Sequence, residues 1–180
     1  MIDALVIIDV QRGMFNIPEL QPFDSEATVS RIAGLLDRSR TAGLPVIFVQ
    51  HDGGNGHPLD IAGSGFPFHS DLSPRHGERI IVKTKCNAFD GTEIEHVIRV
   101  LGIRRVGVCG MQSQYCVDTF VRASSERGFE VELVSDGHTT FDTDTLKAEQ
   151  IIAHHNETLG GGFATLVRAA DVTMPSNAAD

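Results

Sequence analysis

Residues 106–119 combine an apolar strand pattern with a cysteine at the start of a helical pattern. Their sequence, VGVCGMQSQYCVDT, passes through Gly110 and reaches Cys116 where apolar residues begin to recur at helical spacing. Unpaired backbone N–H groups and the helix dipole favour a thiolate at such a position, and the same N–H groups can hold the oxygen of an attacked carbonyl. We therefore interpret Cys116 as a candidate nucleophile. Cys109, inside the strand, is typical of a small core residue.

Two charged residues follow other apolar runs of the strand type. Asp9 ends the run at residues 4–8, and Lys83 follows the run at residues 79–82. Ligands of open parallel sheets bind at the carboxyl ends of the strands, so both side chains are site candidates. Each residue taken alone also has an ordinary structural explanation: Asp9 could cap a loop, and Lys83 could be a solvated surface charge. Because Asp9, Lys83 and Cys116 leave strands at the same edge, we expect them to share one site.

The elements that position these residues alternate along the chain. The patterns predict strands at residues 4–8, 45–49, 79–82, 106–109 and 129–134, with a sixth within 163–172. Helices are expected at about 25–42, 92–101, 116–127 and 144–159. Strand–helix alternation of this kind predicts an α/β fold with a doubly wound parallel sheet. At 180 residues we expect one domain that spans residues 1–180.

Residues 53–78 form a long segment without a clear period, and long loops in compact domains are usually functional. The segment contains His57, His69 and His76, and His51 lies just before it. No helical His pair organises these side chains, so the pattern favours ordinary loop histidines over metal ligands. We expect no metal and no cofactor.

Composition excludes several classes of function. The net charge is −9 and there is no Lys or Arg run, so we expect no nucleic-acid partner. Three irregularly spaced cysteines favour a reducing compartment, and the N-terminus does not have the pattern of a signal peptide. No apolar run reaches the ~20 residues of a membrane span. A cytoplasmic protein without a membrane partner is the expectation.

Three sequence blocks resemble the isochorismatase-like cysteine hydrolase superfamily, which includes nicotinamidases, N-carbamoylsarcosine amidohydrolases and ureidoacrylate amidohydrolases. The blocks are ALVIIDVQ at 4–11, IVKTKCNAFDGT at 81–92 and GMQSQYCV at 110–117, followed by Gly128 and Ser135-Asp136. The resemblance covers nearly the whole chain in the family's order. It implies a three-layer α/β/α fold with a six-stranded parallel sheet of order 3-2-1-4-5-6, and a homodimer or larger homo-oligomer.

The resemblance also implies a catalytic triad of Asp9, Lys83 and Cys116 and a non-proline cis peptide bond between Met111 and Gln112. Some positions depart from the family pattern. Threonine and aspartate are common where this chain has Ser113 and Gln114. The metal-binding Asp-x-His of nicotinamidases is broken, because the corresponding sequence is Gln50-His51-Asp52. True isochorismatases lack a cysteine at position 116, so Cys116 indicates acyl chemistry.

The resulting hypothesis is a hydrolase that cleaves a C–N bond of a small amide, ureide or cyclic amide through a thioester on Cys116. Asp9 would move protons, Lys83 would hold Asp9 and favour the thiolate, and the backbone N–H groups of Gln112 and Cys116 would bind the oxyanion. The predicted substrate-binding residues are Gln11, Phe15, Gln112 and Tyr115.

Three alternatives stay open. The protein could be a small-molecule-binding or scaffold member of the same fold that has lost its chemistry, or an ether hydrolase of the isochorismatase type. A redox role that pairs Cys116 with Cys86 ranks last, because no Cys-x-x-Cys motif is present. Faster electrophilic labelling of Cys116 than of the other cysteines would favour the enzyme.

Overall fold

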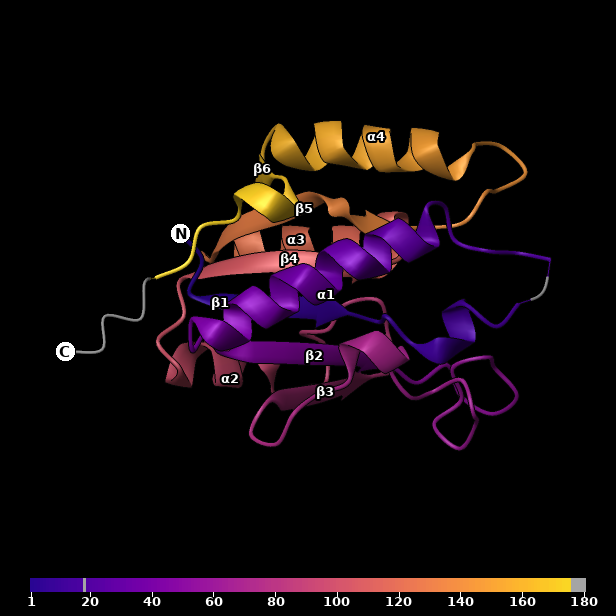
Figure 1. Ribbon diagram of the computed structural model, residues 1–180, viewed down its shortest axis with the longest axis horizontal. Coiled ribbons are helices and arrows are strands. Elements are labelled where there is room, and N and C mark those ends of the chain that lie inside the picture. Colours follow the sequence, from indigo (N-terminus) through magenta and orange to yellow (C-terminus); the bar gives the residue numbers. More distant parts are fainter. Residues whose placement is uncertain (18, 176–180) are drawn as a thin grey trace.

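The computed structural model describes residues 1–17 and 19–175 and contains one six-stranded parallel sheet (Figure 1). The order is β3-β2-β1-β4-β5-β6, so the predicted topology is confirmed. The strands are β1 (Ala4–Ile8), β2 (Val46–His51), β3 (Arg79–Lys83), β4 (Arg105–Met111), β5 (Glu130–Thr139) and β6 (Thr165–Val167). The helices are α1 (Ser25–Thr41), α2 (Ile94–Val100), α3 (Asp118–Glu126) and α4 (Ala148–Gly160).

Helices cover both faces of the sheet and give the fold its three layers. In Figure 1, α1 crosses the near face of the sheet, whereas α2 and α3 lie behind it. The near-face core joins Leu5 and Ile7 of β1 to apolar residues of α1 such as Ile32. The far-face core joins the alternate residues of β1 to Ile98 of α2 and Phe120 of α3. A strand buried on both faces must be apolar throughout, which explains the continuous run at Ala4–Ile8.

Short turns complete the chain between these elements. Single turns of 3-10 helix lie at η1 (Arg12–Met14), η2 (Ser70–Leu72) and η4 (Ala169–Asp171), and a π-helical turn, η3, spans Ser113–Val117. None of the helices in the described ranges has the length and apolarity that a bilayer crossing requires.

Several element boundaries differ from the sequence-based expectation. Strand β5 continues to Thr139, five residues beyond the predicted end, because Gly110 and Met111 of β4 pair with His138 and Thr139 across an irregularity in the register. Helix α4 begins at Ala148 rather than at Asp144, since the Asp142 carboxylate accepts the N–H of Ala148 and caps the helix there. Strand β6 is only three residues long.

Candidate active site

Asp9 is the first residue after β1 and is completely buried. Its backbone adopts a left-handed conformation with φ of 51°, and its N–H donates to the carbonyl of Val49 on the neighbouring strand. The carboxylate oxygen Oδ2 lies 2.7 Å from Lys83 Nζ. The other oxygen, Oδ1, is buried and has no hydrogen-bond partner among the described residues. It is therefore available to a proton or to a donor on a ligand.

Lys83 is the last residue of β3, at the outer edge of the sheet, and its side chain has no exposed surface. It extends past β2 toward the ends of β1 and β4. The ammonium nitrogen donates to Asp9 Oδ2 at 2.7 Å and to Cys116 Sγ at 3.1 Å, and it lies 3.1 Å from His51 Nδ1. Four adjacent strands thus bring a carboxylate, an imidazole, an ammonium and a thiol to the same carboxyl edge.

Cys116 lies in the π-helical turn that joins β4 to α3, and 8% of the residue remains exposed. The predicted cis peptide bond between Met111 and Gln112 is present at the start of this turn. The carbonyl of Gln112 accepts the N–H groups of Tyr115 and Val117 at 3.1 and 3.2 Å, which fixes the backbone on both sides of Cys116. Cys116 is a free cysteine that is largely buried.

A buried hydrogen-bond network supports the same turn from β5 and α4. Ser113 Oγ lies 2.8 Å from His138 Nδ1, and His138 Nε2 lies 3.0 Å from Asn156 Oδ1. Since the Asn156 amide group donates to the carbonyl of Ser135, its Oδ1 accepts the Nε2–H of His138, and the Ser113 hydroxyl donates to Nδ1. Burial lowers the pKa of His138, which keeps the ring neutral and this pattern intact.

Burial and the three neighbouring ionisable groups set the electrostatics of the site. Burial, followed by the carboxylate of Asp9, raises the pKa of the Cys116 thiol, although Lys83 lowers it. Burial also raises the pKa of Asp9. Burial lowers the pKa of Lys83, but the charges of Asp9 and Cys116 outweigh this and raise it. Burial and the Asp9 carboxylate therefore favour the protonated thiol, while Asp9 and Lys83 form the buried ion pair of the site.

The predicted substrate-binding residues do not all lie together. A cavity of about 300 Å³ next to the turn is lined by Gln112 and Tyr115, together with apolar residues such as Met14 and Phe141. Phe15 instead lines a separate cavity of about 260 Å³, where it packs edge-on against His69 with ring centroids 5.0 Å apart. The cavity with Gln112 has the size of a small-molecule site.

Gln11 is buried and is bound to backbone rather than directed at that cavity. Its amide group donates to the carbonyls of His51 and Phe66 at 3.1 and 2.9 Å, and its oxygen accepts the N–H of His51 at 2.8 Å. Gln11 therefore joins the end of β2 to the 53–78 segment.

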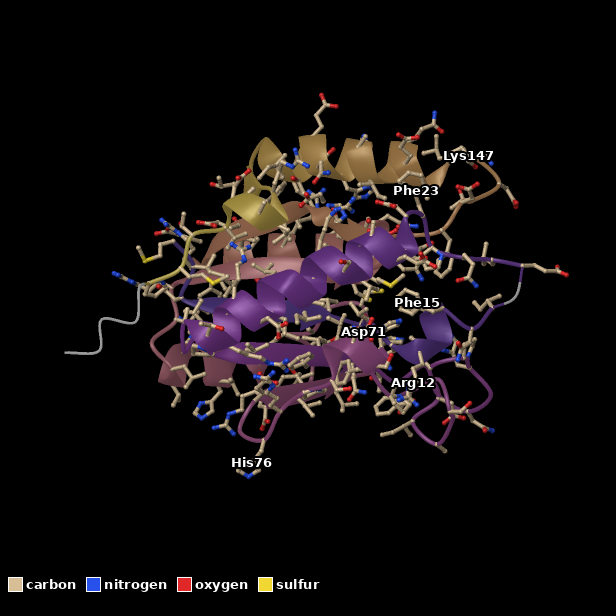
Figure 2. All side chains as sticks on the ribbon, in the orientation of Figure 1. Arg12, Phe15, Phe23, Asp71, His76 and Lys147 are labelled. Carbon is tan, nitrogen blue, oxygen red and sulfur yellow. The ribbon has the colours of Figure 1, made fainter. Side chains whose placement is uncertain are left out.

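The histidines near that segment are dispersed. The ring of His57 lies 6.3 Å from that of His51, His69 packs against Phe15, and His76 projects from a loop away from the rest of the molecule (Figure 2). His51 is the one that contacts Lys83, and its place at the end of β2 was the signal that could have identified it. His57 lines the cavity that also contains Gln112. Asp9, His51 and Cys116 have potential metal ligand atoms within 4.8 Å of one another, but the Lys83 ammonium contacts all three.

The chain is similar in sequence and in structure to known proteins of one family. The isochorismatase domain family model matches residues 3–159. Streptothricin hydrolase of Streptomyces noursei is 30% identical over 95% of this chain, which spans 64% of that protein. A ureidoacrylate amidohydrolase of Azorhizobium caulinodans is 24% identical over 72% of this chain and 70% of its own. An isochorismatase-family crystal structure from Chromobacterium violaceum superposes with a TM-score of 0.88 at 30% identity, covering 93% of this chain and 90% of the other.

Proposed function

The chain belongs to the isochorismatase family of hydrolases, and on that basis we propose that it cleaves a C–N bond of a small amide, ureide or cyclic amide through a thioester on Cys116. One observation supports the proposal above all others. The ammonium of Lys83 lies within hydrogen-bond distance of both the Asp9 carboxylate and the Cys116 sulfur, in a buried site. The relative whose name is ureidoacrylate amidohydrolase supports cleavage of a C–N bond.

The reaction begins with transfer of the Cys116 proton to Asp9. The buried thiol has a raised pKa and needs a base as it attacks, and Asp9 is the carboxylate within reach. The sulfur forms a bond to the carbonyl carbon, and the backbone N–H groups of Gln112 and Cys116 receive the negative oxygen. Lys83 balances the charge that moves from Asp9 to the sulfur, since it contacts both.

The second half of the reaction reverses the proton transfers. The tetrahedral intermediate collapses, the C–N bond breaks, and Asp9 gives its proton to the amine or ammonia, which leaves a thioester. In a cyclic amide the protonated amine stays attached to the acyl group. Asp9 then takes a proton from water as the water attacks the thioester carbon. Release of the carboxylic acid returns the proton to Cys116. Oδ1 of Asp9, which has no partner within the described chain, is the acceptor for both transfers.

Hydrolysis of a panel of small amides, ureides and cyclic amides tests the proposal, followed by ammonia release for the first two classes and by the mass of the ring-opened product for the cyclic amides. We expect at least one compound to be hydrolysed by the unaltered protein and not by Cys116→Ala, because no other group supplies the nucleophile. Cys86→Ala is the matched control, since Cys86 is an exposed free cysteine outside the site, and it should keep full activity. Hydrolysis that persists in Cys116→Ala would contradict the proposal.

A further inference from the structure

The third contact of the Lys83 ammonium is not used by the reaction described above. A protonated lysine has three N–H donors and no acceptor. Asp9 Oδ2 takes one, Cys116 Sγ takes a second, and His51 Nδ1, at 3.1 Å, is in position for the third. Because the Lys83 side chain is fully buried, water does not replace a missing partner, and an unpaired donor on a buried charge is costly.

This contact fixes the chemical state of His51. An ammonium can only donate, so Nδ1 must present its lone pair and the proton of the neutral ring must be on Nε2. Burial, followed by the charge of Lys83, lowers the pKa of His51 to about 4, which is consistent with a neutral ring. His57 lowers the same pKa and Asp52 raises it.

The position of His51 is itself fixed by the fold. His51 and Lys83 are register partners on β2 and β3, so their side chains start from neighbouring positions on the sheet. The Gln11 side chain bonds to both the N–H and the carbonyl of His51. Gln11 follows Asp9 by two residues. The segment that contains Asp9 therefore also fixes the backbone of His51 through the Gln11 side chain.

From these contacts we propose that His51 is a positioning residue, whose neutral imidazole holds the Lys83 ammonium between the Asp9 carboxylate and the Cys116 sulfur. Without it, a flexible lysine is free to pair with the carboxylate, the stronger acceptor, and to move away from the sulfur. The three potential metal ligands at this edge, Asp9, His51 and Cys116, are then the three acceptors of one ammonium. The inference rests on the proposed function, because the position matters for attack by Cys116.

The rate of Cys116 alkylation by iodoacetamide tests the inference without a known substrate. We measure it from pH 6 to 9 by mass spectrometry, in a Cys86→Ser background that removes the exposed thiol. His51→Leu removes the acceptor, and we expect alkylation at pH 7.5 to slow by about tenfold or more, the effect of a lost hydrogen bond to a charged group. His51→Asn supplies an acceptor oxygen near the place of Nδ1, and it should recover to within about threefold.

His76→Leu is the matched control, because this exposed histidine lies on a distant loop, and it should alkylate like the parent protein. An unchanged or faster rate in His51→Leu, or equal loss in the Leu and Asn variants, would overturn the inference. If His51→Leu does not fold, the nitrogen chemical shifts of His51 in the parent protein decide: a protonated Nδ1 at pH 7.5 contradicts the proposal, and an unprotonated Nδ1 supports it.

These outcomes are separate from those of the amide panel. A protein that hydrolyses no amide but shows His51-dependent alkylation would refute the proposed function and leave the role of His51 intact. A protein whose hydrolysis requires Cys116, with a His51→Leu variant as active and as readily alkylated as the parent, would refute the role of His51 alone.

Discussion

Asp9 and Lys83 form an ion pair between two side chains that have no exposed surface. Buried pairs of this kind contribute little net stability compared with apolar replacements, because both charges lose their hydration. A role in catalysis therefore explains this buried ion pair at the carboxyl edge of the sheet better than a contribution to stability does. The pair keeps a negative charge and a compensating cation beside the thiol, where proton transfer needs both.

Replacing Lys83 with Met tests this interpretation. The substitution leaves the Asp9 carboxylate buried without its cation, so we expect a loss of about 3 kcal/mol in the free energy of unfolding. The pKa of Asp9, already raised by burial, should rise further, and Asp9 should hold its proton at neutral pH. Hydrolysis should fall more than 100-fold, because the base is then neutral. Urea unfolding and ammonia release measure the two effects.

The double variant Asp9→Asn/Lys83→Met is the control for that experiment. It removes both charges, so its loss of stability should be smaller than the sum of the losses in the two single variants. Additive losses would mean that the two side chains do not interact as the ion pair requires.

At the scale of elements, the backbones of β1 and β4 lie so close together at Gly110 that no side chain fits there. This residue pairs with Ile8 and has φ of +125°. A Cβ there would lie 2.1 Å from the carbonyl oxygen of Ile8 and 2.6 Å from its nitrogen. Both contacts are with backbone, so the clash has no flexible side chain to absorb it. Close packing here keeps the turn with Cys116 next to Asp9.

Gly110→Ala should therefore destabilise the protein by about 3 kcal/mol, from the clash and the unfavourable backbone angle together. Gly34→Ala is the matched control: Gly34 is exposed in α1, and an added Cβ meets nothing within 4 Å. There alanine should stabilise the helix by about 0.5–1 kcal/mol. Thermal and urea unfolding provide both values, and equal effects at the two positions would contradict the packing argument.

The elements also explain why parts of the site could not be predicted from the sequence. The run at 106–109 and the helical spacing after Cys116 predicted a strand and a helix, but not the π-helical turn between them. Ser113 of that turn bonds to His138, which in turn bonds to Asn156, and both partners lie far along the chain. The extension of β5 through Gly137 was missed for a similar reason, because pairing with β4 overrides the turn-like sequence.

At the scale of the whole molecule, buried apolar runs and strand–helix alternation were sufficient to predict the parallel sheet and to place the candidate site at its carboxyl edge. Asp9, Lys83 and Cys116 lie at or just beyond the ends of three different strands, and the parallel topology brings them together as expected. The raised pKa of the Cys116 thiol was not predictable, since it depends on burial and on the Asp9 carboxylate. The expected homo-oligomer and the single domain over 1–180 stay predictions.

Two histidines, the buried His138 and the half-buried His51, give the whole molecule a characteristic pH dependence. Burial lowers the pKa of both His51 and His138 in the folded state, whereas unfolded histidines take up protons near about pH 6.5. As the pH falls from about 6.5 to 5, the unfolded chain therefore binds more protons than the folded chain, and the free energy of unfolding should decrease. His51→Asn should make this decrease shallower.

Urea denaturation midpoints at several pH values from 7 to 5 measure that slope. The comparison of His51→Asn with the parent isolates one histidine from other titrating groups, including Asp9, whose raised pKa acts in the opposite direction. An identical slope in the two proteins would show that His51 is not held neutral by its surroundings.

The central claim is that the Cys116 sulfur becomes covalently bonded to the acyl group of the substrate. The most direct test is intact-protein and peptide mass spectrometry of samples acid-quenched during turnover of an amide that the panel identifies. We predict a mass increase located on Cys116 and absent from Cys116→Ala. It equals the substrate minus the amine or ammonia that leaves, or the whole substrate when a cyclic amide is opened. Turnover by the parent protein with the acyl group on another residue, together with hydrolysis by Cys116→Ala, would contradict this account.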